Sequence, residues 1–326
     1  MKGMTALALN RYDDKQTPKN ILASLKETAI TKEELGMYWI QPGHSYWWYE
    51  APIEAQSLLI EAFTELEKGS PDIDRMKVWL LKQKQTQNWT STKATADACY
   101  ALLLSGSDWL VNEPVVSIRL GEKTIRSTEI NTQKGTGYFK VNYPGSEVKP
   151  SMGDINVSVQ NNSSSTSWGA VYWQYFEDMD KTSFAATPLV VKKQLFIERN
   201  TDRGPQLEPI TANNTLKVGD KMKARIEIIV DRDMEYVHLK DMRAAAFEPV
   251  NVISTYKWQG GLGYYESTKD ASTNFFFSYL GKGKYVFEYP MFVTNKGDFS
   301  NGITTIQCMY APEFSSHTEG MRITVK

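Results

Sequence analysis

The sequence predicts an α+β multidomain chain in which helical hairpins are followed by two antiparallel β-sandwich-type blocks. The chain has 326 residues, which at about 150 residues per domain corresponds to two or three domains. Apolar residues recur with the period of a helix up to about residue 107, and they alternate with the period of a strand from there onward. Hydrophobic residues make up 41% of the chain, enough for ordinary cores. We expect domains at residues 1–107, 108–183 and 184–326.

Residues 1–107 contain roughly five helix signals joined by short connections, which predicts antiparallel neighbours. Pro18 and Pro52 each stand at the start of a helix, where the missing N–H of proline costs nothing. Ser91 or Thr92 is the expected N-cap of the last helix. The strongest helix signal has the i, i+3, i+4, i+7 spacing at Ala55, Leu58, Leu59, Ala62, Phe63 and Leu66. The last helix repeats this spacing at Thr95, Ala98, Cys99, Leu102 and Leu103.

Residues 108–183 alternate between apolar and polar positions, which predicts short strands. Gly121-Glu122 is the expected turn of a hairpin. At about 75 residues the block is small for a sandwich of its own, so we expect it to be part of a β domain. The alternating triplets are Val116, Ile118 and Leu120; Phe139, Val141 and Tyr143; Ile155, Val157 and Val159; and Ala170, Tyr172 and Gln174.

Residues 184–326 form a second and longer β block. Residues 189–197 read as one strand, and residues 303–309 read as a late strand. Between them, the residues from Met222 to Val230 alternate as in a half-buried strand. Strands this short, separated by turns with Gly and Pro, predict an antiparallel sandwich.

Charge and cysteine content exclude several function classes. The 37 Lys and Arg balance 38 Asp and Glu, so we expect no nucleic-acid partner and no attraction to an anionic membrane surface. No apolar run is long enough for a membrane span. Cys99 and Cys308 stand in a helix pattern and a strand pattern, and we expect two buried free thiols. The three His (His44, His238 and His317) have no metal-ligand spacing, so we expect no metal and no cofactor.

The first ten residues read as the middle of a helix. They contain one Lys and no long apolar core, so they are not a signal peptide. A chain that opens inside a helix pattern is expected to be a fragment of a longer protein.

Ordered segments along the chain carry a family resemblance. In the helical part they are YEAPIEAQSLLIEA (49–62), VWLLKQKQ (78–85) and NWTSTKATADACYAL (88–102). These segments resemble the last two helical hairpins of the thioester domain in the alpha-2-macroglobulin and complement family. Residues 241–249 resemble a D-x-x-P-A-G-F-E region of bacterial members, with Ala where Pro and Gly are usual. Residues 267–277 and 310–314 resemble the C-terminal ends of bacterial macroglobulins.

The resemblance implies a fold for each part of the chain. Residues 1–107 would be the C-terminal helices of a thioester-domain-like α/α toroid. Residues 108–183 would be the second half of a CUB domain. Residues 184–326 would be the terminal macroglobulin-like sandwich. The chain would then be the C-terminal fragment of a macroglobulin-like endopeptidase inhibitor, a protease trap.

The resemblance also sets limits on the chemistry of this chain. Family members that trap covalently use a Cys-x-x-Gln thioester, but Cys99 is followed by Tyr-Ala-Leu and Cys308 by Met-Tyr-Ala. We therefore expect no thioester, no bait region, no catalytic residue and a structural or conformational role. The implied partners are the remainder of the parent chain, with its missing toroid hairpins and macroglobulin-like domains, and target proteases bound through the intact parent. The implied location is the periplasm or cell envelope, after export.

Four residues are candidates for binding or for the inside of the toroid: Trp47, Trp48, Glu54 and Trp258. Exposed Trp often carries binding energy, whereas a buried Trp would only line the ring or pack on a neighbour. Glu54 meets the dipole of its own helix, although a carboxylate can also do acid–base work. Two alternatives remain open: a surface carbohydrate-binding or adhesion module that uses Trp47, Trp48 and Trp258, and a toroid/sandwich polysaccharide lyase that uses His44, Tyr46 and Glu54.

Overall fold

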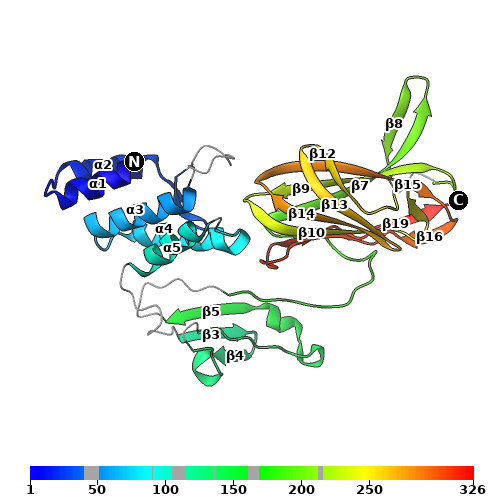
Figure 1. Ribbon diagram of the computed structural model, residues 1–326. Helices are drawn as coiled ribbons and strands as arrows, with labels where there is room; N and C mark the ends of the chain where they lie inside the picture. The colour runs from blue at the N-terminus through cyan, green and yellow to red at the C-terminus, as the bar shows by residue number, and fades with distance from the viewer. Residues whose placement is uncertain (40–50, 90, 105–114, 135–136, 161–168, 212–215) are drawn as a thin grey trace. The chain divides into compact units, whose positions relative to one another are not determined.

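The structure is a computed structural model, and it describes residues 1–39, 51–89, 91–104, 115–134, 137–160, 169–211 and 216–326. The chain divides into two units (Figure 1). The first consists of residues 1–84 and 89–175, and the second of residues 85–88 and 176–326.

Five α-helices form the helical part of the first unit, within the described residues. Pro52 stands at the first position of its helix, as predicted. Ser91 is the N-cap of the last helix, because its Oγ accepts a hydrogen bond from the N–H of Ala94 at 2.9 Å. The helices are α1 (Lys2–Arg11), α2 (Thr17–Thr28), α3 (Pro52–Leu66), α4 (Pro71–Thr86) and α5 (Thr92–Leu103), and a small hairpin joins β1 (Ile30–Lys32) to β2 (Gly36–Tyr38).

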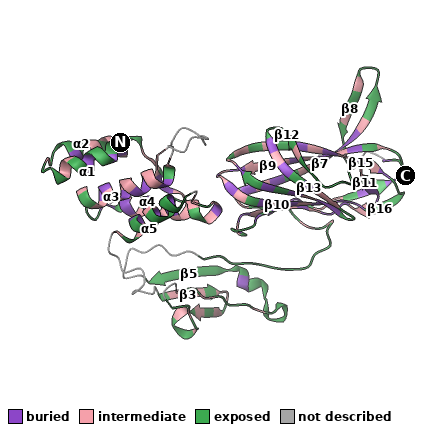
Figure 2. Cartoon of the chain, viewed as in Figure 1, coloured by how far each residue is buried: buried purple, intermediate pink, exposed green. Residues whose placement is uncertain are grey.

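The helices share one apolar core, which lies on their facing sides (Figure 2). Phe63 of α3 is completely buried, and the ring of Trp39 lies 6.2 Å from it. Other fully buried members are Ala6, Ile60, Met76, Leu80, Ala94, Ala98 and Ala101.

The expectation of a buried Cys99 is wrong, because this side chain is exposed. The buried stripe of α5 consists of Ala94, Ala98 and Ala101, and Leu103 points to solvent. Of the predicted positions, Ala98 and Leu102 contact the core, whereas Thr95, Cys99 and Leu103 are exposed. Cys308 is buried, as expected.

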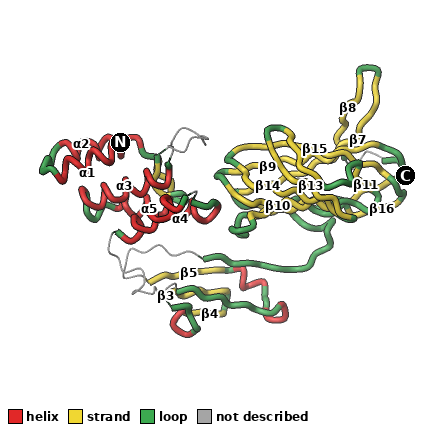
Figure 3. Tube along the Cα trace, in the orientation of Figure 1, coloured by secondary structure: helices red, strands yellow, loops and turns green. Residues whose placement is uncertain are grey.

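The residues between 115 and 160 form a three-stranded antiparallel sheet with the order β4-β3-β5. The predicted hairpin at Gly121 is present. Two predicted strands are not: residues 139–143 and 170–174 have no strand structure, and residues 169–177 run as an extended segment (Figure 3). The strands are β3 (Val115–Leu120), β4 (Lys123–Arg126) and β5 (Ile155–Gln160).

The second unit is an antiparallel β-sandwich, as predicted. One sheet has the order β12-β13-β14-β10-β17-β18-β6, the other has the order β11-β15-β9-β7-β8, and β16 pairs with β19. The strands are β6 (Ala185–Ala186), β7 (Leu189–Thr201), β8 (Gly204–Pro209), β9 (Lys221–Val230), β10 (Met234–Met242), β11 (Phe247–Pro249), β12 (Thr255–Gln259), β13 (Leu262–Lys269), β14 (Ser272–Leu280), β15 (Gly283–Val293), β16 (Gly297–Ser300), β17 (Thr304–Cys308), β18 (Ser315–His317) and β19 (Arg322–Val325).

The core of the sandwich lies between its two large sheets, because alternate residues of each strand point inward. Tyr264, Phe275, Phe277 and Phe287 pack there with ring centroids 4.9–6.2 Å apart. Aromatic pairs in this range add stability beyond the area that they bury.

Candidate functional site

The four candidate residues from the sequence fall in three places. Trp47 and Trp48 lie outside the described residues, as do His44 and Tyr46. Glu54 lies in the first turn of α3, in the first unit. Trp258 lies on β12, in the second unit.

Glu54 connects two helices of the first unit. Its Oε1 accepts a hydrogen bond from Ser91 Oγ at 3.3 Å, and the same hydroxyl caps α5. A carboxylate in the first turn of a helix also interacts favourably with the helix dipole. These contacts give Glu54 a structural role at the start of α3 and α5.

Trp258 stands on an edge strand, and 73% of its surface is exposed. The β12–β13 hairpin turns at Gly260 and Gly261, whose φ angles of 60° and 77° suit glycine and fit a two-residue hairpin turn. Trp258 is therefore held at the rim of the sandwich by a short and well-defined turn.

A buried ionic cluster, defined here as Lys193, Asp241, Tyr289 and Thr304, lies inside the sandwich. Lys193 Nζ lies 2.6 Å from Asp241 Oδ1, and the side chains are 5% and 0% exposed. Thr304 Oγ1 donates to the same oxygen at 2.6 Å, and the Tyr289 hydroxyl donates to Oδ2. Lys193 also donates to the carbonyl of Met242 at 2.8 Å. Both oxygens of the buried carboxylate thus have partners.

Burial sets the protonation of Tyr289 in this cluster. Loss of solvent raises the pKa of its hydroxyl well above the usual value, and the negative charge of Asp241 raises it further. The neutral hydroxyl is therefore the donor and the Asp241 carboxylate is the acceptor. The cluster joins strands β7, β10, β15 and β17, and so connects the two sheets across the core.

Sequence reasoning missed this cluster, although a signal was present. Lys193 occupies an inward position of β7, between Val191 and Leu195. Asp241 also occupies an inward position, two residues after Leu239 near the end of β10. A charged residue at an inward position of an apolar strand needs a buried partner of opposite charge. Pairing two such positions would have predicted the ion pair.

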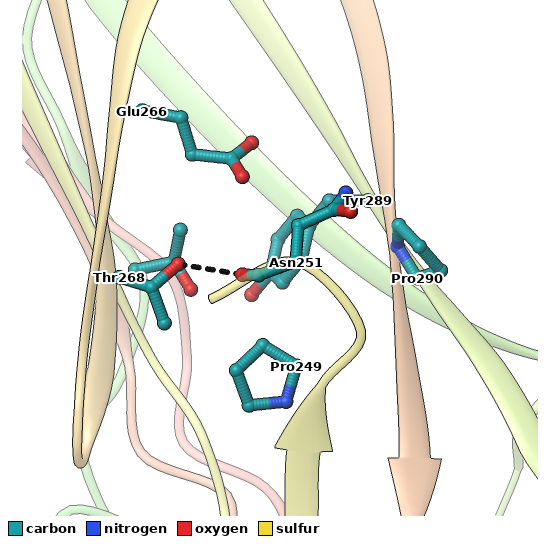
Figure 4. Close-up of a pocket in the computed structure, with 7 residues that line it drawn as sticks. Pro249, Asn251, Glu266, Thr268, Tyr289 and Pro290 are labelled. Atoms are coloured by element: carbon teal, nitrogen blue, oxygen red, sulfur yellow. Dashed lines mark hydrogen bonds between the residues drawn. The ribbon is translucent and has the colours of Figure 1, made fainter. Parts of the chain in front are cut away.

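A side groove opens between β12 and β15, with a volume of about 320 Å³. A narrow recess adjoins it at Asn251, Tyr289 and Pro290 (Figure 4). Glu266 points into this recess from β13, and Lys257 of the groove donates to Glu266 Oε1 at 2.7 Å. The other residues of the side groove are Trp258, Gln259, Tyr264 and Glu288.

Tyr264 lines the side groove with its hydroxyl in the neutral form. Burial, together with the nearby Glu266, raises the pKa of Tyr264 to about 12, so this hydroxyl stays neutral. Within the described ranges, no group of three His, Cys, Asp or Glu is placed to hold a metal ion. None of the helices in the described part of the chain is long and apolar enough to cross a membrane.

Comparison with known proteins identifies the sandwich. Residues 189–313 match the family described as Bacterial Alpha-2-macroglobulin MG10 domain. These residues include β7 to β17 and all members of the buried ionic cluster. A search of curated protein sequences finds no match.

Solved structures of alpha-2-macroglobulin align with the chain at low identity. A Salmonella alpha-2-macroglobulin mutant is 14% identical, with 98% of this chain and 19% of that chain covered and a TM-score of 0.37. The trypsin-activated protein from Escherichia coli is 12% identical, with 98% of this chain and 21% of that chain covered and a TM-score of 0.43. A native Escherichia coli structure that spans domain MG7 to the C-terminus is 10% identical, with 98% of this chain and 48% of that chain covered and a TM-score of 0.35.

This chain spans less than half of the length of each of these structures. Scores this low carry no part of the assignment, which rests on the match of residues 189–313. Residues 189–313 of the sandwich therefore resemble the MG10 domain of bacterial alpha-2-macroglobulin.

Proposed function

We propose that this chain is the C-terminal portion of a macroglobulin-like endopeptidase inhibitor and has a structural role in it. The match of residues 189–313 to the MG10 domain carries the proposal. The helices would complete a toroid, and the sheet at residues 115–160 would be half of a CUB-like domain. No residue of this chain would be catalytic. The parent would be exported to the periplasm or the cell envelope, where it would meet its target proteases.

The size of the natural product tests this proposal. An antibody raised against the sandwich should detect a cellular product much larger than 37.1 kDa. When the cell envelope fraction is treated with trypsin or elastase, that product should be cut once and then retain the protease. A product of 37.1 kDa that retains neither protease would overturn the proposal.

The small sheet supports the idea of a missing partner within the parent chain. Every residue of β5 is exposed, and β5 is an edge of its sheet. The apolar side chains of this strand, Ile155, Val157 and Val159, are all exposed. A contiguous exposed apolar patch usually marks an interaction site. An unpaired strand edge beside exposed apolar side chains invites association with another strand.

We expect the isolated chain to bind the dye ANS and to self-associate through β5. Replacing Val157 and Val159 together by Lys should reduce both, because charges on an edge strand oppose pairing. Ser158→Lys adds a charge to the same strand without removing apolar surface, and the comparison separates the two effects. Dye fluorescence and sedimentation velocity measure the outcome. A monomer that binds no dye would argue against a missing partner.

A further inference from the structure

We propose that the side groove binds a neutral oligosaccharide, with a sugar ring stacked on Trp258 and hydroxyl groups bonded to Lys257 and Glu266. The proposal concerns the sandwich alone and does not depend on the role of the parent chain. It rests on the groove's fixed ends, on an unpaired carboxylate oxygen and on the exposed aromatic rings at the rim.

Contacts at both ends fix the shape of the side groove. At one end, Gln259 Oε1 accepts a hydrogen bond from the N–H of Glu288 at 2.8 Å, which ties β12 to β15. A Cβ on Gly260 would lie 2.7 Å from the carbonyl oxygen of Val286, so the hairpin tip touches β15. At the other end, Thr268 Oγ1 donates to the carbonyl of Asn251 at 3.0 Å (Figure 4). The volume of about 320 Å³ lies at the lower end of the range for small-ligand sites.

Glu266 presents an unused acceptor beside this groove. The residue is only 2% exposed, and its Oε2 has no hydrogen-bond partner in the structure, whereas Oε1 is bonded to Lys257. An unpaired buried carboxylate oxygen is costly, so a donor that reaches it is bound favourably. Lys257 lines the groove and donates to Glu266, whose carboxylate lines the adjoining recess.

The charges of the groove favour an uncharged ligand with hydroxyl groups. Lys257 is paired with Glu266, and Glu288 is paired with Arg225 at 2.6 Å, so the groove carries no net charge that would attract an ion. Two neighbouring hydroxyls fit both partners, since one donates to the carboxylate and the other accepts from the ammonium group. Charge-assisted hydrogen bonds of this kind are stronger than neutral ones.

Aromatic rings extend the site from the groove onto the outer face of the sheet. Trp258 lies edge-on to Tyr256, with centroids 6.3 Å apart. Tyr256 pairs in register with Tyr265 on β13, which pairs with Phe276 on β14, and all three are exposed. Neighbouring strands lie about 4.8 Å apart, so this row spans roughly 10 Å. A row of exposed rings suits an extended chain of flat sugar faces better than a single compact ligand.

Calorimetric titration of the whole 326-residue chain tests the proposal. The probes are neutral hexasaccharides of α-linked glucose, β-linked glucose, β-linked xylose and β-linked N-acetylglucosamine. At least one should bind, and Trp258→Ala should weaken it roughly tenfold or more. Trp173→Ala is the matched control, because Trp173 is 50% exposed and lies in the first unit; it should leave the affinity unchanged.

Glu266→Gln should also weaken binding, since it removes the charge that the hydroxyl meets. Trp258 is a surface residue, so its variant remains informative if Glu266→Gln folds poorly. The proposal is overturned if none of the four hexasaccharides binds, or if Trp258→Ala binds as tightly as the unmodified chain. Stronger binding of a hexasaccharide of galacturonic acid would also overturn it, because that ligand is anionic.

Discussion

Replacing Asp241 by Ala should lower the free energy of unfolding of the sandwich by about 3–5 kcal/mol. The substitution leaves the Lys193 ammonium buried without its counter-ion, and this is the main source of the loss. The hydroxyl donors of Thr304 and Tyr289 also lose their acceptor. Chemical denaturation followed by tryptophan fluorescence measures the change.

Two control variants separate the loss of the ion pair from the general effect of replacing a side chain by Ala. Asp202→Ala, in the exposed turn between β7 and β8, should change the free energy of unfolding by less than about 0.5 kcal/mol. The double variant Lys193→Met with Asp241→Leu should recover most of the stability, because no charge is then buried alone. A loss below about 1 kcal/mol for Asp241→Ala would show that the cluster is not fully buried in solution.

The strands of the sandwich were predictable because one face of each is buried. Alternation over residues 222–230 follows from inward side chains that meet the opposite sheet, and β9 occupies this segment. The N-cap of α5 was also predictable, because a Ser hydroxyl satisfies a backbone N–H that the helix leaves free. Both the strand and the helix cap leave a short-range pattern in the sequence.

Other elements depended on packing that the sequence pattern does not contain. Phe139, Val141 and Tyr143 alternate like a strand, yet they pair with neither edge of the described sheet, β4 or β5. Alternation is necessary for a half-buried strand, but a strand also needs a neighbour that provides hydrogen bonds. The position of Cys99 similarly depended on which side of α5 meets α3.

The candidate site was predictable only in part. Trp258 was a candidate from the sequence, and it is exposed beside a hairpin turn. Its groove partners Lys257, Glu266 and Glu288 come from three strands. Their proximity depends on sheet order and on the crossing from β11 to β12, which no short motif encodes.

Replacing Phe63 by Ala should lower the free energy of unfolding of the helical part by about 3–5 kcal/mol. Phe63 is completely buried, it packs against Trp39, and the ammonium group of Lys26 lies 5.8 Å from its ring centre. Removal of the ring leaves a cavity that α3 and its neighbours fill only partly. Loss of helical circular dichroism on denaturation measures the effect.

The same variant tests whether the proposed domain boundary near residue 107 separates independent folding units. If it does, Phe63→Ala shifts the helical transition and leaves the sandwich transition in place, whereas Asp241→Ala does the reverse. Tyr12→Ala, at an exposed aromatic residue in the helical part, should shift neither. A single transition that both variants shift equally would mean that the helices and the sandwich unfold together. The sandwich would then depend on the helical part for its stability, and the boundary would mark only a change of secondary structure.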